Sequence, residues 1–153
     1  MPTVVPCQRL DQYINRTLEA GDWLELDQPQ INQFADVTLD TQYIHTDPER
    51  AAQTPFGGTI AHGLLSLSLL PYLTESCSIV PEGTVMGVNY GFNKVRFLSP
   101  VKPGDSVRAQ SKVLAVKEKE GGRYLITVEV TVDIKGQTKP ALVAEWINMF
   151  VCT

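Results

Sequence analysis

The sequence contains few of the residues that build metal centres and disulfide frameworks. Its 153 residues include two histidines and three cysteines, which stand far apart at Cys7, Cys77 and Cys152. The number of cysteines is odd and no CxxC motif occurs, so neither a structural zinc site nor a disulfide framework is expected. The thiols are predicted to be reduced and structural, and no bound metal ion is predicted.

Clustered positive charge and long apolar runs are also absent. The net charge is −4 and no basic run of five residues occurs, which argues against a nucleic-acid partner. The longest apolar stretch, residues 64–73, is about ten residues long, whereas a membrane span needs roughly 18. Residues 1–12 contain two prolines and no apolar core of signal-peptide length. We therefore expect a cytoplasmic protein with no membrane partner.

The composition that remains is that of one ordinary globular domain, predicted to cover residues 1–153. Hydrophobic residues make up 43% of the chain and charged residues 20%. The first half predicts helices and one short edge strand. Helical spacing and capping signals predict helices over 7–21, 27–38, 46–53 and 60–77, with a strand over 22–26. The helix over 60–77 is apolar on nearly every side and is expected to be buried, with a bend at Pro71.

The second half predicts an antiparallel sheet. In residues 123–135 the apolar side chains alternate with polar ones, which is typical of a half-buried strand. Similar segments cover 84–101, 105–119 and 139–152, and glycine-containing turns separate the last three strands. A sheet that is apolar on one face must cover that face, and the buried helix is the obvious cover. The predicted class is α+β, with a long antiparallel sheet wrapped around a central helix.

One stretch, "LDTQYIHTDPERA", holds the first chemical signal. It places Asp40 five residues before His45, between two predicted helices. Both side chains could simply be solvated loop residues. However, Asp40 would follow a helix C-terminus, where the helix dipole disfavours an anion. A carboxylate near an imidazole is a plausible pair for holding a water molecule and moving protons.

A second signal is the glycine in "GGTIAHGLL". Gly63 begins the apolar helix, where the first backbone N–H groups lack internal partners and lie at the positive end of the dipole. A glycine there lets a ligand oxygen approach the backbone, as an oxyanion site requires. The alternative is that the glycines only shape a loop and a tight helix entry. For His62, just before Gly63, a structural hydrogen bond is the favoured role.

Together these stretches resemble the MaoC-like dehydratase family, which includes the (R)-specific enoyl-CoA hydratases. The family motif S-G-D-x-N-P-[LIV]-H-x-D-P-x-x-A is similar to residues 38–51, and its I-x-H-G signature is similar to residues 60–63. Residues 88–109 resemble a third region, in which a strand is followed by a proline and a G-D/S-x-V sequence. The resemblance covers roughly residues 28–150 and is strongest to the subgroup that resembles the nodulation protein NodN.

The resemblance implies a hot-dog fold, an activity and a homodimer. It implies an (R)-specific enoyl-CoA hydratase, or 3-hydroxyacyl-thioester dehydratase, that adds water to trans-2-enoyl-CoA. Asp40 and His45 would activate the water, with Asp40 as the main base. The backbone N–H of Gly63 would stabilise the enolate oxygen. Coenzyme A or an acyl carrier protein would carry the acyl group, and no cofactor is implied.

The sequence departs from the family motif next to the two catalytic positions. Leu39 stands where the motif has glycine, Gln42 replaces asparagine and Tyr43 replaces proline. Gln42 and Tyr43 are expected to contact the water, the thioester or the entrance, while the acyl chain is expected to lie along the apolar helix, near Leu64, Leu67 or Pro71. Lys94, Arg96 or Lys102 would meet the phosphates of coenzyme A.

Two other functions stay open at this point. A hot-dog acyl-CoA thioesterase would need a carboxylate on the central helix, and the nearest acid, Glu75, is far from the start of that helix. A non-catalytic acyl-thioester-binding accessory protein would bind the same ligand without turning it over. The departures at Leu39 and Tyr43 are compatible with such a protein.

Overall fold

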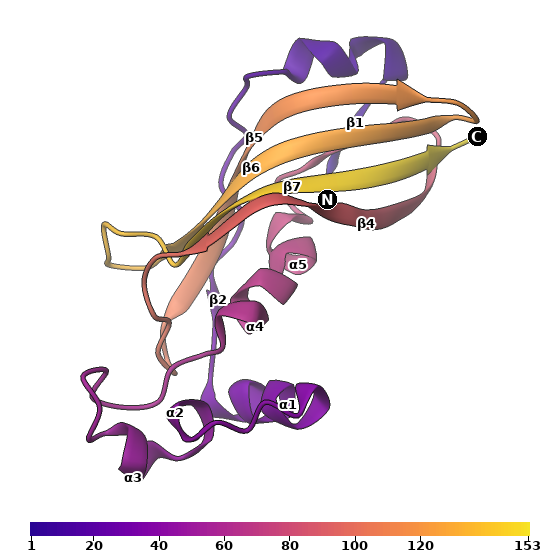
Figure 1. Cartoon of the computed structure of the whole chain (residues 1–153). Coiled ribbons are helices and arrows are strands. Elements are labelled where there is room, and N and C mark those ends of the chain that lie inside the picture. Colours follow the sequence, from indigo (N-terminus) through magenta and orange to yellow (C-terminus); the bar gives the residue numbers. More distant parts are fainter.

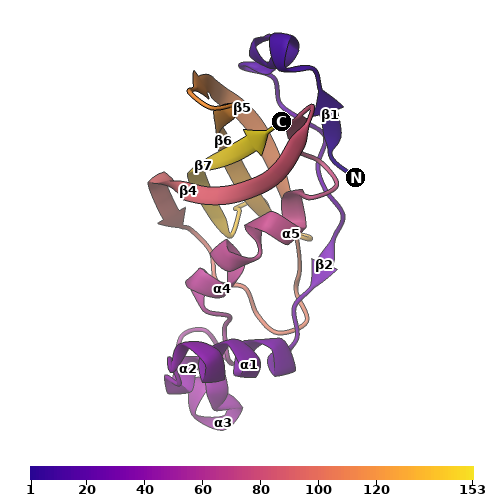
Figure 2. The same cartoon turned by 90° about the vertical axis from the view of Figure 1, so that its right-hand side faces the viewer.

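The computed structural model describes residues 1–153 and has the expected α+β architecture (Figure 1). A five-stranded antiparallel sheet in the order β2-β5-β6-β7-β4 curls around two short central helices (Figure 2). The strands are β1 (Thr3–Val5), β2 (Leu24–Glu25), β3 (Ile79–Pro81), β4 (Thr84–Phe97), β5 (Ser106–Lys119), β6 (Arg123–Ile134) and β7 (Leu142–Cys152). The helices are η1 (Cys7–Tyr13), α1 (Gln28–Thr38), α2 (Tyr43–Thr46), α3 (Pro48–Ala51), α4 (Gly63–Ser68) and α5 (Leu70–Thr74).

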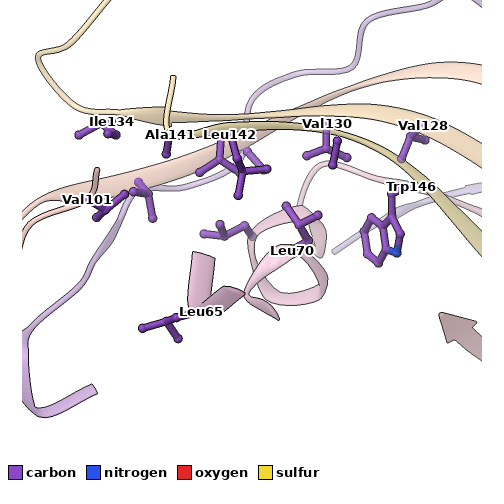
Figure 3. Packing of buried hydrophobic residues seen from close by; sticks show 14 of the residues in the cluster. Leu65, Leu70, Val101, Val128, Val130, Ile134, Ala141, Leu142 and Trp146 are labelled. Carbon is purple, nitrogen blue, oxygen red and sulfur yellow. The ribbon is translucent and has the colours of Figure 1, made fainter. Parts of the chain in front are cut away.

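The four long strands confirm the prediction from alternation. On β6 every second residue from Ile126 to Ile134 is buried, because these side chains face the helices. Figure 3 shows this face: Leu70 of α5 points toward the sheet, and Leu142 and Trp146 of β7 project from it. Burying a large aliphatic or aromatic side chain contributes about 1.5–3 kcal/mol. The packing of α5 against the sheet therefore provides much of the stability of this half.

The predicted helix starts at 27 and 47 are confirmed. The Asp27 carboxylate accepts a hydrogen bond from the Gln30 backbone N–H, and the Asp47 carboxylate accepts one from the Arg50 backbone N–H. Each cap satisfies an N–H group that the helix itself cannot pair. Helices α1, α2 and α3 gather at the end of the molecule below α4, away from the long sheet (Figure 1).

The predicted helix over 7–21 is wrong beyond Tyr13. Only the 3₁₀ helix η1 forms, after which Asn15 adopts a left-handed backbone with φ of 65°. The chain then runs along β5, and the N–H groups of Asn15, Leu18 and Gly21 donate to β5 carbonyl oxygens. The free edge of β5 offered these hydrogen bonds, which outweighed the local helical pattern. Gly21, expected to stop a helix, instead passes close to α5, since a Cβ there would lie 2.6 Å from the Leu73 carbonyl oxygen.

The predicted continuous helix over 60–77 is two helices with a junction at Leu69. Pro71 lies in the first turn of α5, where its missing N–H removes no helical hydrogen bond. The expectation of burial on nearly every side is also wrong, because Leu64 and Tyr72 are exposed on the side away from the core. None of the helices is long and apolar enough to cross a lipid bilayer. The cytoplasmic location stays a prediction.

Candidate active site

Three side chains from separate segments meet below the start of α4. They are Asp40 after α1, His45 on α2 and His62 just before α4, and one ligand-type atom from each lies within 4.8 Å of the others. Both imidazoles are buried, whereas the Asp40 side chain is 55% exposed. The structure therefore brings together the predicted pair, Asp40 and His45, adds His62, and leaves the group open to solvent at the carboxylate.

The hydrogen bond of His45 determines which ring nitrogen is free. His45 Nδ1 lies 2.7 Å from the carbonyl oxygen of Ile60, which accepts only, so Nδ1 carries the proton. The lone pair is then on Nε2. Burial lowers the pKa of His45 below its ordinary value of 6.5, and this effect outweighs the opposing influence of the Ile60 hydrogen bond. His45 is thus a neutral imidazole at neutral pH, with Nε2 available to accept a proton.

His62 connects the acid to the other histidine. Its Nε2 donates to the backbone carbonyl oxygen of Asp40 at 2.9 Å and lies 4.0 Å from Asp40 Oδ2. Its ring stacks on His45 with centroids 3.8 Å apart and planes at 22°. The predicted structural hydrogen bond of His62 is confirmed. It holds the backbone of Asp40, while the stacking holds the plane of His45.

The sequence analysis missed two side chains that hold His45 and His62 in place. Phe34 of α1 packs edge-on against His62, with ring centroids 4.9 Å apart. Its spacing from the buried Ile31 is the helical i, i+3 pattern, which was the available signal. Gln28 donates from Nε2 to the His45 carbonyl oxygen at 2.7 Å and accepts from Thr59 Oγ1. Nothing in the local sequence indicates that role, because its partners are distant along the chain.

The backbone at Leu39 explains why the motif has a glycine at this position. It forms the end of α1 in a left-handed conformation, with φ of 63°. Helices commonly end in this way on a glycine, which has no Cβ to strain. Leu39 has the same backbone conformation at a higher energy, and it directs the chain from α1 to Asp40.

Replacing Leu39 with glycine is expected to stabilise the protein. The left-handed conformation costs a non-glycine residue about 1–2 kcal/mol, and the greater freedom of glycine in the unfolded chain offsets about half of that gain. The melting temperature should rise by about 2 °C. Leu39→Ala is the control, because it shortens the exposed side chain but keeps the Cβ. If alanine stabilised as much as glycine, the exposed side chain and not the backbone would be the cause.

Gly63 is packed tightly where α4 begins. A Cβ on Gly63 would lie 2.9 Å from Cδ1 of Phe97, so no other residue fits without displacement of that ring. Gly63 and Phe97 line a cavity of about 250 Å³ together with Phe56, Ile60 and Pro100, which we term the Gly63 cavity. Neither Asp40 nor His45 lines it. Ile60 contacts both features, because it lines this cavity and its carbonyl oxygen binds His45.

A second cavity, of about 220 Å³, lies between α5 and the concave face of the sheet. We term it the α5 cavity. Its walls include Pro71 of α5, Val88 of β4, Val128 of β6 and Trp146 of β7. Leu64 and Leu67, expected beside the acyl chain, line neither cavity. Leu64 is exposed and Leu67 packs on the core, so their contact with substrate stays a prediction.

The remaining predicted contact residues lie near the Asp40–His45–His62 group. Gln42 caps α2, and its backbone carbonyl oxygen accepts from the His45 N–H at 3.0 Å. Tyr43 is exposed, and the Arg50 guanidinium lies over its ring, 4.3 Å from the ring centroid. Lys94, Arg96 and Lys102 are exposed. The roles of these residues toward a substrate stay predictions.

The same three side chains are poorly arranged for a metal ion. Each histidine has one free ring nitrogen, but the stacked rings direct their lone pairs in nearly parallel planes. Two imidazoles bind one ion only when their lone pairs converge on it at about 2.0–2.1 Å. The group is better suited to hold water and exchange protons.

Comparison with known proteins agrees with this fold. The family described as MaoC like domain matches residues 9–137, a segment that starts nearer the N-terminus than the resemblance over 28–150. The 3-hydroxyacyl-thioester dehydratase Z of Mycobacterium tuberculosis is 48% identical over 131 residues, covering 86% of each chain. Nodulation protein N of Rhizobium leguminosarum is 47% identical over 138 residues, covering 89% of this chain and 85% of its own.

A solved structure extends the likeness to the whole fold. The monoamine oxidase regulatory protein of Archaeoglobus superposes with a TM-score of 0.76 at 26% identity, over 92% of this chain and 91% of its own. The chain belongs to the MaoC-like dehydratase family and has the hot-dog fold. It is a hydro-lyase of the hydratase and dehydratase class.

Proposed function

We propose that this chain, as a single hot-dog domain over residues 1–153, is an (R)-specific enoyl-thioester hydratase. It adds water across the double bond of a trans-2-enoyl thioester and, in reverse, dehydrates the 3-hydroxyacyl thioester. The supporting observation is the Asp40–His45–His62 group, in which a carboxylate meets a buried, neutral imidazole with one free nitrogen. No cofactor takes part in the proposed reaction.

The proposed reaction needs one base and one proton donor. A water molecule held between the Asp40 carboxylate and His45 Nε2 loses a proton to Asp40, and its oxygen bonds to carbon 3 of the substrate. The electron pair of the double bond moves toward the thioester, and carbon 2 then receives a proton from the same pair. General acid–base catalysis of this kind contributes about 10²–10⁴-fold. His62 keeps both groups in position through the contacts to Asp40 and His45.

The enolate oxygen requires a donor, which we assign to the backbone N–H of Gly63. The first N–H groups of a helix have no partner within the helix, and a glycine leaves room for an oxygen. The Gly63 cavity offers space for a thioester beside this N–H. Losing one such donor costs about 10²–10³-fold in kcat in other enzymes.

The proposed substrate is carried by coenzyme A or an acyl carrier protein. Since Pro71 was expected beside the acyl chain and lines the α5 cavity, we place the far part of that chain there. Gln42 and Tyr43 would then border the reacting end. The exposed cations Lys94, Arg96 and Lys102 are available to the phosphates that both carriers possess.

We further propose that the protein is a homodimer joined through β4. This strand is at the edge of the sheet, and its unpaired backbone N–H and C=O groups can form hydrogen bonds with another strand. Large apolar side chains on it and just after it are exposed, namely Val85, Met86, Tyr90, Phe97 and Leu98. Pairing of two β4 strands would bury this surface in a two-fold interface.

Replacing Tyr90 with lysine is expected to convert the dimer to a monomer. A charge in the middle of a self-pairing strand would face its own copy across the two-fold axis, and edge lysines oppose strand pairing. Light scattering during size-exclusion chromatography measures the mass. Gln8→Lys adds the same charge on the exposed η1 and should leave the mass at twice 16.9 kDa. A monomeric wild type, or a dimeric Tyr90→Lys, contradicts the proposed interface.

The experiment that tests the function is turnover of crotonyl-CoA. Hydration removes the enoyl-thioester absorbance, and chiral analysis of the product should give (R)-3-hydroxybutyryl-CoA. Binding without loss of absorbance, for crotonyl-CoA and for longer enoyl-CoAs, would contradict the proposal and favour a non-catalytic binding protein. Release of free coenzyme A would instead indicate a thioesterase. Against that activity, Glu75 lies at the far end of α5 from Gly63.

A further inference from the structure

The inward-facing side chains of two strands are interrupted by polar residues. On β7 the inward positions begin with Leu142, Ala144 and Trp146, and the next is Asn148. On β5 the buried Val107 and Ala109 are followed by Ser111, which is 2% exposed. A polar residue at an inward position of an otherwise apolar strand costs stability unless it has a partner. These two positions therefore need an explanation that packing does not supply.

Both polar residues line the α5 cavity. Asn148 is paired across the sheet with Asn89 of β4, so a second amide faces the same space from the neighbouring strand. The inward neighbours on β6, Ile126 and Val128, are apolar and line the cavity as well. The cavity thus has a strip of apolar side chains from β6, with Ser111 of β5 on one side of it and the two amides of β7 and β4 on the other.

Trp146 is an independent indication that a ligand binds in the α5 cavity. The residue is 4% exposed, lines the α5 cavity, and its indole Nε1–H has no hydrogen-bond partner. Figure 3 shows the indole projecting from β7 on the same side of the sheet as α5. Because an indole nitrogen only donates, its missing partner is an acceptor. Buried N–H groups in native proteins nearly always have one.

From these groups we infer that the α5 cavity selects enoyl thioesters whose acyl chain bears an oxygen substituent, a hydroxyl or a ketone, far from the thioester. This inference rests on the proposed function. The oxygen would accept from Trp146 Nε1, and the Asn148 amide, two residues further along the same face of β7, would bind it as donor or acceptor. The methylenes nearer the thioester would contact Ile126 and Val128 of β6.

The size and place of the cavity match the far part of a medium-length chain. Gly63 and Pro71 are eight residues apart across the junction between α4 and α5, which corresponds to at most ~12 Å of helical rise. An extended decenoyl chain starting at Gly63 reaches this depth, whereas a crotonyl group stops short of it. A cavity of about 220 Å³ has room for such a chain end, since an apolar cavity of about 150 Å³ already holds a benzene molecule.

The test compares two thioesters that differ only at the chain end. The wild-type protein is expected to turn over 10-hydroxy-trans-2-decenoyl-CoA with a kcat/KM at least about tenfold above that for trans-2-decenoyl-CoA. A site built to hydrogen-bond a substrate hydroxyl rejects the analogue that lacks it, because its own polar groups are left unpaired. Equal values, or a preference for the methyl end, overturn the inference.

Two substitutions in the cavity and one control show where the selectivity arises. Asn148→Leu continues the apolar series of β7 and is expected to reverse the preference toward trans-2-decenoyl-CoA. Trp146→Phe keeps an aromatic ring, removes the donor and should reduce the preference. Thr127→Val, on the opposite face of β6, should leave it unchanged. An unchanged preference in both cavity variants overturns the inference.

Two further readouts separate this inference from the proposed function. A crotonyl group is too short for the proposed contact at the chain end, so turnover of crotonyl-CoA by the wild type tests the proposed function without testing the cavity. The chain has two tryptophans, so in a Trp23→Phe background fluorescence reports on Trp146 alone. Stronger quenching by the hydroxylated thioester, without turnover of any thioester, would support the cavity assignment and refute the hydratase. Turnover of crotonyl-CoA without any preference between the two long thioesters would support the hydratase and refute the cavity assignment.

Discussion

Replacing Asp40 with asparagine, or His45 with glutamine, is expected to lower kcat/KM for crotonyl-CoA by about 10²-fold or more. Asparagine keeps the size of the side chain but cannot take a proton from water. Glutamine in place of His45 removes the free ring nitrogen that the Ile60 hydrogen bond leaves available. Asp36→Asn is the matched control, because it removes the same charge from an exposed position one turn earlier on α1. It should retain full activity.

The melting temperatures of the variants show whether a loss of activity comes from lost catalysis or from unfolding. The Asp40 side chain is 55% exposed and asparagine has nearly the same size, so Asp40→Asn should melt near the wild type. A folded Asp40→Asn with normal turnover would remove Asp40 from the proposed mechanism. Loss of activity in Asp36→Asn as well would indicate a general effect of charge.

The pH dependence of turnover is a second test of the Asp40–His45 pair. Activity requires neutral His45, and burial lowers its pKa below 6.5. Turnover by the wild type should therefore stay level as the pH falls to 6.5 and decline only below it. Stability has the same sign: the unfolded chain binds a proton near pH 6.5 and the folded chain does not, so stability falls as the pH drops from 6.5 through the lower folded pKa. An activity decline that begins above pH 6.5 would contradict this role.

Replacing Gly63 with alanine is expected to cost about 10²-fold in kcat, comparable to the loss of an oxyanion donor. The new Cβ would lie 2.9 Å from the Phe97 ring, so that ring, or the start of α4 with its N–H, must move. Overpacking of this kind also destabilises by about 1–3 kcal/mol. Turnover of crotonyl-CoA and thermal unfolding measure the two effects separately.

A double substitution distinguishes displacement from simple instability. In Gly63→Ala with Phe97→Leu, the smaller side chain gives the Cβ room, and both stability and part of the activity should return. Gly58→Ala is the control, since no atom lies within 4 Å of its added Cβ and its backbone is not left-handed. Wild-type turnover by Gly63→Ala would exclude the proposed donor.

The sheet and its cover were predictable because their signals are local. Alternation from Ile126 to Ile134 depends on neighbouring residues alone, and the burial of that face follows from the period of a strand. The same holds for the capped helix starts at Asp27 and Asp47, where a side chain bonds a backbone N–H three residues later. The spacing from Asp40 to His45 was likewise visible, because a short stretch holds both residues.

Other features depended on segments that are far apart in the chain. The helix predicted for residues 7–21 ended early because the edge of β5 offered its carbonyl oxygens, which no local pattern reveals. The stacking of His45 on His62 required α2 and the start of α4 to meet, and Gln28 of α1 helps to hold them together. Buried polar groups need hydrogen-bond partners, and here the partners come from segments that are distant along the chain.

The sequence by itself determined the fold class, the family and the acid–histidine pair, since each is written in short motifs and in a periodic pattern. Only the tertiary structure decided which nitrogen of His45 is free, why a side chain at Gly63 would displace Phe97, and which polar residues line the α5 cavity. Those properties come from distances between residues that are remote along the chain, such as Ser111 and Asn148. Such distances are set by the packing of the sheet on its helices.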